Sequence, residues 1–109
     1  MGNYLRVHRR RARLTQQELG KLVGYERPWQ ISRHERSKAI PPFLIALAYQ
    51  AVFGTPVSEI FLGIHVTVVQ VVEKRIAELQ ADLEAKGGTL SEDQATIQKI
   101  QWLTKRNKR

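Results

Sequence analysis

Residues 15–37 read TQQELGKLVGYERPWQISRHERS, and this stretch determines the fold expected for the first half of the chain. Thr15 and Glu18 have the spacing of a capping box, which predicts that a helix begins here. The apolar residues after them recur at the spacing of one buried helix face: Leu19, Leu22 and Val23. Gly24 follows, at a place where the turn that ends a helix favours a positive φ. The sequence therefore predicts one short helix and then a turn.

A second short helix is predicted over Pro28–Arg36. Proline fits the first position of a helix, and the residue before it, Arg27, is kept out of the helical region. When successive residues are placed about 100° apart around the helix axis with Ile31 inward, His34 and Glu35 fall on the buried side. The outward side then contains Trp29, Arg33 and Arg36, flanked by Gln30, Ser32 and Ser37.

The predicted outward side combines positive charge, an aromatic ring and an amide. An α-helix fits the major groove of B-DNA, where arginine can bind guanine through two hydrogen bonds and glutamine can bind adenine in the same way. Apolar groups can contact the thymine methyl there. A solvated surface without a ligand is the alternative interpretation of these side chains.

Together these residues resemble the helix-turn-helix of the Cro/repressor type, a large family of DNA-binding regulators in bacteria and phages. The resemblance covers about residues 4–62. The matching positions are Thr15-Gln16 at the start of the first motif helix, the small residue Gly20, the turn residue Gly24, the core residue Ile31, the run ISRHERSKAIPP from Ile31, and VSEIF at 57–61. The segment between Gly24 and Ile31 is one residue longer than is usual in the family. The sequence therefore leaves open which of Arg27, Trp29 and Gln30 contacts a base.

The resemblance implies a sequence-specific, dimeric transcriptional regulator, a repressor that binds a near-palindromic operator through Pro28–Arg36. The base contacts that it implies are those of Arg33, Trp29 and Gln30. The phosphate contacts that it implies are those of Gln16, Arg27, Ser32, Arg36 and Lys38. In the family an ion pair joins the first helix to the motif, and the matching residues are Arg9 and Glu35. The other interpretation is an autoregulating antitoxin, whose C-terminal helices would bind a small protein partner.

The charge of the chain agrees with binding to a polyanion such as double-stranded DNA. The 109 residues include 18 Lys and Arg against 10 Asp and Glu, a formal net charge of +8. Residues 1–40 contain ten of the cations and three of the acids, and the last five residues contain four more cations. A basic segment can be merely a solvated surface, but beside a helix-turn-helix it favours nucleic-acid binding.

The rest of residues 1–63 is expected to complete an all-α DNA-binding domain of five helices. A first helix is predicted over about residues 4–13, a fourth over 43–53 and a short fifth over 57–62, with Gly63 closing the domain. The predicted core residues of the fourth helix are Phe43, Ala46, Leu47 and Val52.

Residues 64–109 are expected to form a separate helical extension with an apolar seam typical of a coiled coil. The seam residues recur at alternating intervals of three and four: Val69, Val72, Ile76, Leu79 and Leu83. We expect this seam to join two copies of the chain in a homodimer. Residues 64–72 are also rich in valine and threonine, so a strand there remains an alternative.

A final helix is predicted after Gly87-Gly88, which we expect to break the seam helix. Ser91 and Gln94 have the spacing of a helix cap. The apolar residues along one side of this final helix are Ile97, Ile100 and Leu103. This side can fold back on the seam within one chain or pack on a second subunit, and the sequence does not choose between them.

Several classes of function find no support in the sequence. The chain has no cysteine, and its three histidines lack partners at zinc-ligand spacing, so no metal and no cofactor is expected. No phosphate-binding glycine loop or nucleophile motif is present, so catalysis is not expected. No apolar stretch approaches the roughly 20 residues that span a bilayer, and we expect a cytoplasmic protein without a membrane partner.

Overall fold

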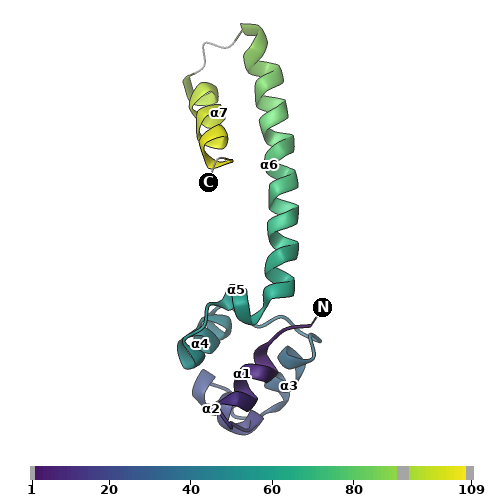
Figure 1. The fold of residues 1–109 in the computed structure, drawn as a ribbon, viewed down its shortest axis with the longest axis vertical. Coiled ribbons are helices and arrows are strands. Elements are labelled where there is room, and N and C mark those ends of the chain that lie inside the picture. Colours follow the sequence, from purple (N-terminus) through teal and green to yellow (C-terminus); the bar gives the residue numbers. More distant parts are fainter. Residues whose placement is uncertain (1, 91–93, 108–109) are drawn as a thin grey trace. The chain divides into compact units, whose positions relative to one another are not determined.

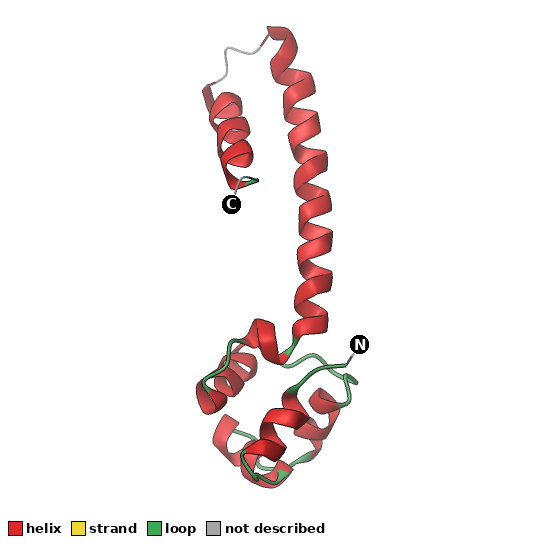
Figure 2. Ribbon diagram, in the orientation of Figure 1, coloured by secondary structure: helices red, strands yellow, loops and turns green. Residues whose placement is uncertain are grey.

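The computed structural model describes residues 2–90 and 94–107, and every regular element in them is a helix (Figures 1 and 2). The helices are α1 (Leu5–Arg11), α2 (Gln16–Val23), α3 (Trp29–Glu35), α4 (Phe43–Phe53), α5 (Val57–Ile60), α6 (Leu62–Leu90) and α7 (Gln94–Arg106). The expectation of an all-α chain is confirmed for this described part. Within it, no helix is both long and apolar enough to cross a membrane.

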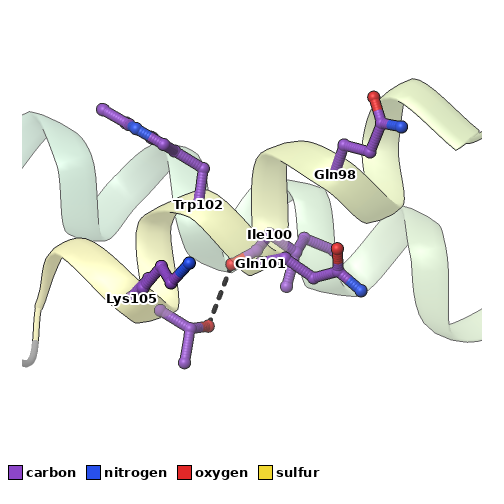
Figure 3. A pocket seen from close by; sticks show the side chains of 6 residues that line it. Gln98, Ile100, Gln101, Trp102 and Lys105 are labelled. Carbon is purple, nitrogen blue, oxygen red and sulfur yellow. Dashed lines mark hydrogen bonds between the residues drawn. The ribbon is translucent and has the colours of Figure 1, made fainter.

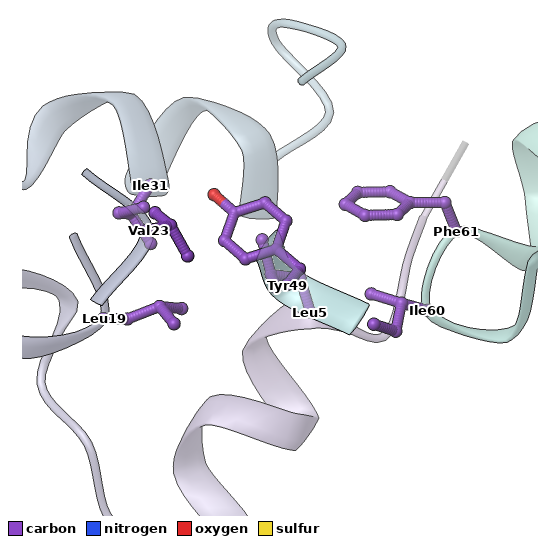
Figure 4. Close-up of a cluster of buried hydrophobic side chains, with 7 residues drawn as sticks. All are labelled: Leu5, Leu19, Val23, Ile31, Tyr49, Ile60 and Phe61. Atoms are coloured by element: carbon purple, nitrogen blue, oxygen red, sulfur yellow. The ribbon is translucent and has the colours of Figure 1, made fainter. Parts of the chain in front are cut away.

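The chain divides into two compact units, residues 1–67 and 68–109. The sequence predicted the boundary at Gly63, whereas the division falls four residues later, inside α6. In the first unit, helices α1 to α5 surround one apolar core (Figure 4). Its buried side chains are Leu5, Leu19, Val23, Ile31, Tyr49, Ile60 and Phe61.

The predicted ends of α2 are confirmed. The amide of Glu18 donates to Thr15 Oγ1 (3.0 Å), and the amide of Thr15 donates to Glu18 Oε1 (2.9 Å), so both halves of the capping box are present. Gly24 ends the helix with φ 105°, a conformation in which residues with a Cβ are strained. Residues 24–28 then connect α2 to α3.

Helix α1 ends in a Schellman motif. The amides of Arg13 and Leu14 donate to the carbonyls of Arg10 (3.0 Å) and Arg9 (3.1 Å). The left-handed residue of such a motif is usually glycine, but here it is Arg13, with φ 60°. An arginine therefore occupies a strained position between α1 and α2.

Helix α4 has the predicted bounds but presents a different face to the core. Phe43 and Leu47 are 74% and 38% exposed, so placing them in the core was wrong, whereas Ala46 and Val52 are half-buried. The side of α4 that packs on the core consists of Ile45, Ala48, Tyr49, Val52 and Phe53. Every residue of α4 except Gln50 is apolar, so the hydrophobic pattern alone does not identify the buried face.

The predicted helix boundaries after α4 were partly wrong. Helix α5 ends at Ile60, and Gly63 lies in the first turn of α6 rather than at a domain end. Residues 64–72 are helical, which excludes the strand alternative, and α6 continues through Gly87-Gly88 to Leu90. A glycine costs a helix only about 1 kcal/mol relative to alanine, which a 29-residue helix tolerates. The predicted cap residue Ser91 lies outside the described residues.

In the second unit, α7 folds back beside α6 of the same chain (Figure 1). Arg106 pairs with Glu73 (2.6 Å), and Asn107 Nδ2 donates to Gln80 Oε1 (3.0 Å). Leu103 is buried, and Ile97 and Ile100 are half-buried. The fold-back arrangement, which the sequence left open, is therefore present within one chain.

The corrected face of α4 predicts a contrast between two aromatic residues. Tyr49→Ala should cost about 3–5 kcal/mol of unfolding free energy, because it removes a fully buried ring from the core. Phe43→Ala should change it by less than about 0.5 kcal/mol, because that ring is exposed. Urea denaturation of both variants measures the difference. Equal losses would contradict this orientation of α4.

Candidate nucleic-acid interface

Helix α3 presents a cationic and aromatic side to solvent. Trp29 is 56% exposed, and Arg33 and Arg36 are exposed as well. Ile31, His34 and Glu35 lie on the opposite, buried side. The inward and outward sides expected from the sequence agree with these exposures. Two further cations predicted to contact phosphate, Arg27 and Lys38, flank the helix and are exposed.

The buried carboxylate of Glu35 joins the first three helices. Arg9 Nε and Nη2 donate to its two oxygens (2.5 and 3.1 Å), which gives a bidentate ion pair between α1 and α3. Gln16 Nε2, at the start of α2, donates to Glu35 Oε1 (3.1 Å). Arg6 Nε contacts the same oxygen at 3.4 Å. Three donor side chains from two helices therefore fix the end of α3.

The ionisation of Glu35 reflects these contacts. Burial raises the pKa of the carboxyl group, but the hydrogen bonds from Arg9 and Gln16 outweigh burial and hold the pKa below its usual value. The same carboxylate raises the pKa of Arg9. Glu35 is thus charged and satisfied at neutral pH, and its stabilising contribution is present above the pKa of the unfolded chain and is lost as the pH falls through the folded pKa.

A buried histidine on the same inward side as Glu35 also fixes α3. His34 Nδ1 and the hydroxyl group of Tyr49 are 2.7 Å apart, and the rings meet edge to face. Burial lowers the pKa of His34, and the positive charge of Arg33 lowers it further, so this side chain is neutral at pH 7. Asn3 Nδ2 donates to the carbonyl oxygen of His34 (2.8 Å) and so holds the chain before α1 against α3.

The segment after α3 also has a fixed geometry. The amides of Ser37 and Lys38 donate to the carbonyls of His34 (3.2 Å) and Arg33 (2.9 Å), which forms a second Schellman motif. Ser37 takes the left-handed position, with φ 57°. The backbone at Lys38 therefore has a defined position relative to the end of α3.

Three predicted contact residues are less exposed than the arginines. Gln16 is half-buried, and its amide nitrogen is used by Glu35. Ser32 is half-buried, with its carbonyl oxygen 3.4 Å from Arg36 Nε. Gln30 is also half-buried, and its Oε1 is buried with no hydrogen-bond partner among the described residues. Since an unsatisfied buried oxygen is costly, rotation of Gln30 toward a ligand would relieve this cost.

The sequence identified the Arg9–Glu35 pair but not the other two donors. Arg6 lies three residues before Arg9, on the same side of α1, a spacing that could have suggested its role. Gln16 was assigned to phosphate alone. Its contact with Glu35 depends on how α2 meets α3, and the sequence pattern does not specify that geometry.

The described residues contain no group of three or more histidine, aspartate or glutamate side chains placed to hold a metal ion. Comparison of the chain with family models, with curated proteins and with solved structures found no match. By its own residues, this surface is an exposed, positively charged helix side with one aromatic ring, and contacts on the buried side of α3 hold it in place.

The buried Arg9–Glu35 pair predicts a large and non-additive loss of stability. Arg9→Met and Glu35→Gln should each cost about 3–5 kcal/mol of unfolding free energy, because each leaves one buried charge without its partner. The double variant should lose less than the sum of the two.

The exposed pair Arg106–Glu73 is the matched control. Glu73→Gln should cost far less than either buried variant, because both side chains reach solvent. Chemical denaturation of all four variants gives the free energies. Strict additivity at Arg9 and Glu35 would rule out the coupling.

Proposed function

We propose that this protein is a cytoplasmic, sequence-specific DNA-binding regulator of the Cro/repressor type, which binds an operator as a dimer and represses transcription. The observation that carries the proposal is the exposed side of α3, where Trp29, Arg33 and Arg36 face solvent while Glu35 is fixed from behind. A helix of this size can enter the major groove of B-DNA, which is about 12 Å wide.

In this proposal some side chains of α3 contact bases, and others contact phosphates. Arg33 lies in the middle of the exposed side and is the leading base contact, because a guanidinium group can bind guanine through two hydrogen bonds. Trp29 supplies an apolar surface for a thymine methyl, and Gln30 an amide for adenine. Arg36 and Lys38, at the end of the helix, serve the DNA backbone.

Dimerisation is proposed through the α6 seam. Val69, Val72 and Leu79 are 39% to 48% exposed in the single chain. Ile76 and Leu83 are half-buried, on the side of α6 where α7 bonds Glu73 and Gln80. Half of the seam thus remains available to a second copy. Two copies related by a two-fold axis would read half-sites about 10 base pairs apart, or a multiple of that.

The second candidate is an antitoxin-like protein whose C-terminal helices bind another protein. It is favoured by the breadth of the apolar surface on α6, which extends beyond the seam to Val68 and Val71, both at least 39% exposed. A two-stranded coiled coil needs a narrower stripe. Helix α7 adds Trp102, 58% exposed, beside a hollow that includes Ile100 and Lys105 (Figure 3).

Purification from the native host separates the two candidates. A homodimer without a second polypeptide supports the repressor, whereas a stoichiometric small partner that covers α6 or α7 supports the antitoxin. Native mass spectrometry distinguishes the two by the masses of the chains in the complex.

The proposed division of labour on DNA predicts different behaviour for two cations. On a duplex selected from a random library by the wild-type protein, Arg33→Ala should cost roughly 1–3 kcal/mol and relax the preference at one base. Lys38→Ala should weaken selected and scrambled duplexes alike and lower the salt slope by about one unit. Fluorescence anisotropy titrations measure both. If Arg33→Ala lost the same binding free energy on the selected and the scrambled duplex, its role as a base reader would be refuted.

The proposed seam predicts that negative charge on its exposed residues separates the dimer. Val72→Asp with Leu79→Asp should yield a folded monomer that binds operator more weakly, because these side chains are exposed within one chain. Gln70→Asp with Ala81→Asp adds the same charge to the opposite, also exposed side of α6 and should leave the dimer intact. Sedimentation is the measurement. A wild-type monomer at tens of micromolar would exclude the seam as a dimer interface.

A further inference from the structure

Helix α1 is unusually rich in arginine, and the pair with Glu35 uses only part of it. Residues 1–17 contain five arginines and no acidic residue. Arg9 and Arg6 contact Glu35. Arg10, Arg11 and Arg13 are exposed, and none of them forms an ion pair within the described part of the chain. Three exposed cations among residues 1–17 therefore have no assigned role.

The three remaining arginines do not all face the same way. Around the axis of α1, Arg10 lies next to Arg6, on the flank that faces Glu35 and α3. Arg11 points to nearly the opposite side from the Arg6–Arg9 face. Substitution of Arg10 or of Arg11 by alanine therefore changes the net charge equally but affects different surfaces of the molecule.

The turn that contains Arg13 is linked to the end of α3 through the side chains of Arg9 and Gln16. Arg9 Nη1 donates to the carbonyl oxygen of Leu14 (2.9 Å), while its other nitrogens bind Glu35. Gln16, three residues after Arg13, also binds Glu35. Side chains that precede and follow Arg13 in the sequence, Arg9 and Gln16, thus both bind the last residue of α3, immediately before the exposed Arg36.

Arg13 also occupies the backbone position where a glycine would be unstrained. Its φ of 60° lies in the left-handed region, and its amide completes the Schellman motif that ends α1. Its exposed side chain makes no ion pair within the described residues that would compensate the strain. Strained residues of this kind are often retained where the side chain meets a ligand.

We propose that Arg10 and Arg13 form a second DNA contact, which binds phosphate groups of the duplex backbone beside the groove that α3 occupies. This inference rests on the proposed function. With α3 in the major groove, one phosphate strand would pass each edge of the helix, and in this proposal the α1–α2 turn, linked to Glu35 through Arg9 and Gln16, would meet one of these strands. Guanidinium groups suit this role because they bind phosphate oxygens through two parallel hydrogen bonds. This phosphate contact does not depend on the DNA sequence, and it increases the length of DNA that each domain contacts.

The test compares Arg10→Ala and Arg13→Gly with Arg11→Ala, using the full-length protein and a random-sequence duplex. The slope of log K against log salt, measured between about 50 and 200 mM, should fall by about 0.9 for each phosphate group that the first two variants no longer bind. Arg11→Ala should leave the slope close to the wild-type value. Arg13→Gly should melt at or above the wild-type temperature, because glycine accepts the left-handed conformation.

Three failing outcomes are distinguishable. A wild-type protein that binds no duplex at low salt would overturn the proposed function together with this inference. A wild-type protein that binds duplex, with the same slope change in Arg10→Ala, Arg13→Gly and Arg11→Ala, would overturn this inference alone, because the arginines would then act only through net charge. A loss of folding in Arg13→Gly would show that Arg13 is structural and would also overturn its role.

Discussion

A carboxylate with no exposed surface needs a counter-charge and hydrogen-bond donors inside the protein, and Glu35 obtains them from two other helices. Arg9 binds both of its oxygens, and Gln16 binds one of them. Desolvation makes an unpaired carboxylate here far costlier than an exposed one, so α1, α2 and α3 are held in a single arrangement. Helix α3 is only seven residues long, so contacts at Glu35 determine how the whole helix is rotated. The direction in which its outward side faces follows from these contacts.

The same constraint explains how a protein of this size can present a rigid cationic surface. Arg33 and Arg36 repel each other and gain nothing from the core, so their placement depends on the inward residues Ile31, His34 and Glu35. Residues 1–40 contain seven more cations than acids, and this excess charge favours a polyanionic ligand. In the proposed function, the buried ion pair provides the geometry and the exposed cations provide the affinity.

Features that local sequence signals determine were predicted correctly, whereas features that depend on tertiary packing were not. Thr15 with Glu18 and Gly24 mark the ends of α2 by interactions within one turn, and these ends were predicted correctly. The buried face of α4 was not, because apolar residues surround that helix and only its packing places Tyr49 rather than Phe43 inside. Gly63 and Gly87 suggested breaks in α6, but their small helix penalty is outweighed by a 29-residue helix. The contact of Gln16 with Glu35 likewise depends on helix packing.

The most direct test of the central claim is a protection footprint of the full-length protein on DNA of its own genome, at about physiological ionic strength of 0.15 M. The account predicts a few short protected segments, each nearly palindromic, with half-sites about 10 base pairs apart or a multiple of that. Uniform, salt-sensitive protection without preferred segments, or no protection at any protein concentration, would contradict it.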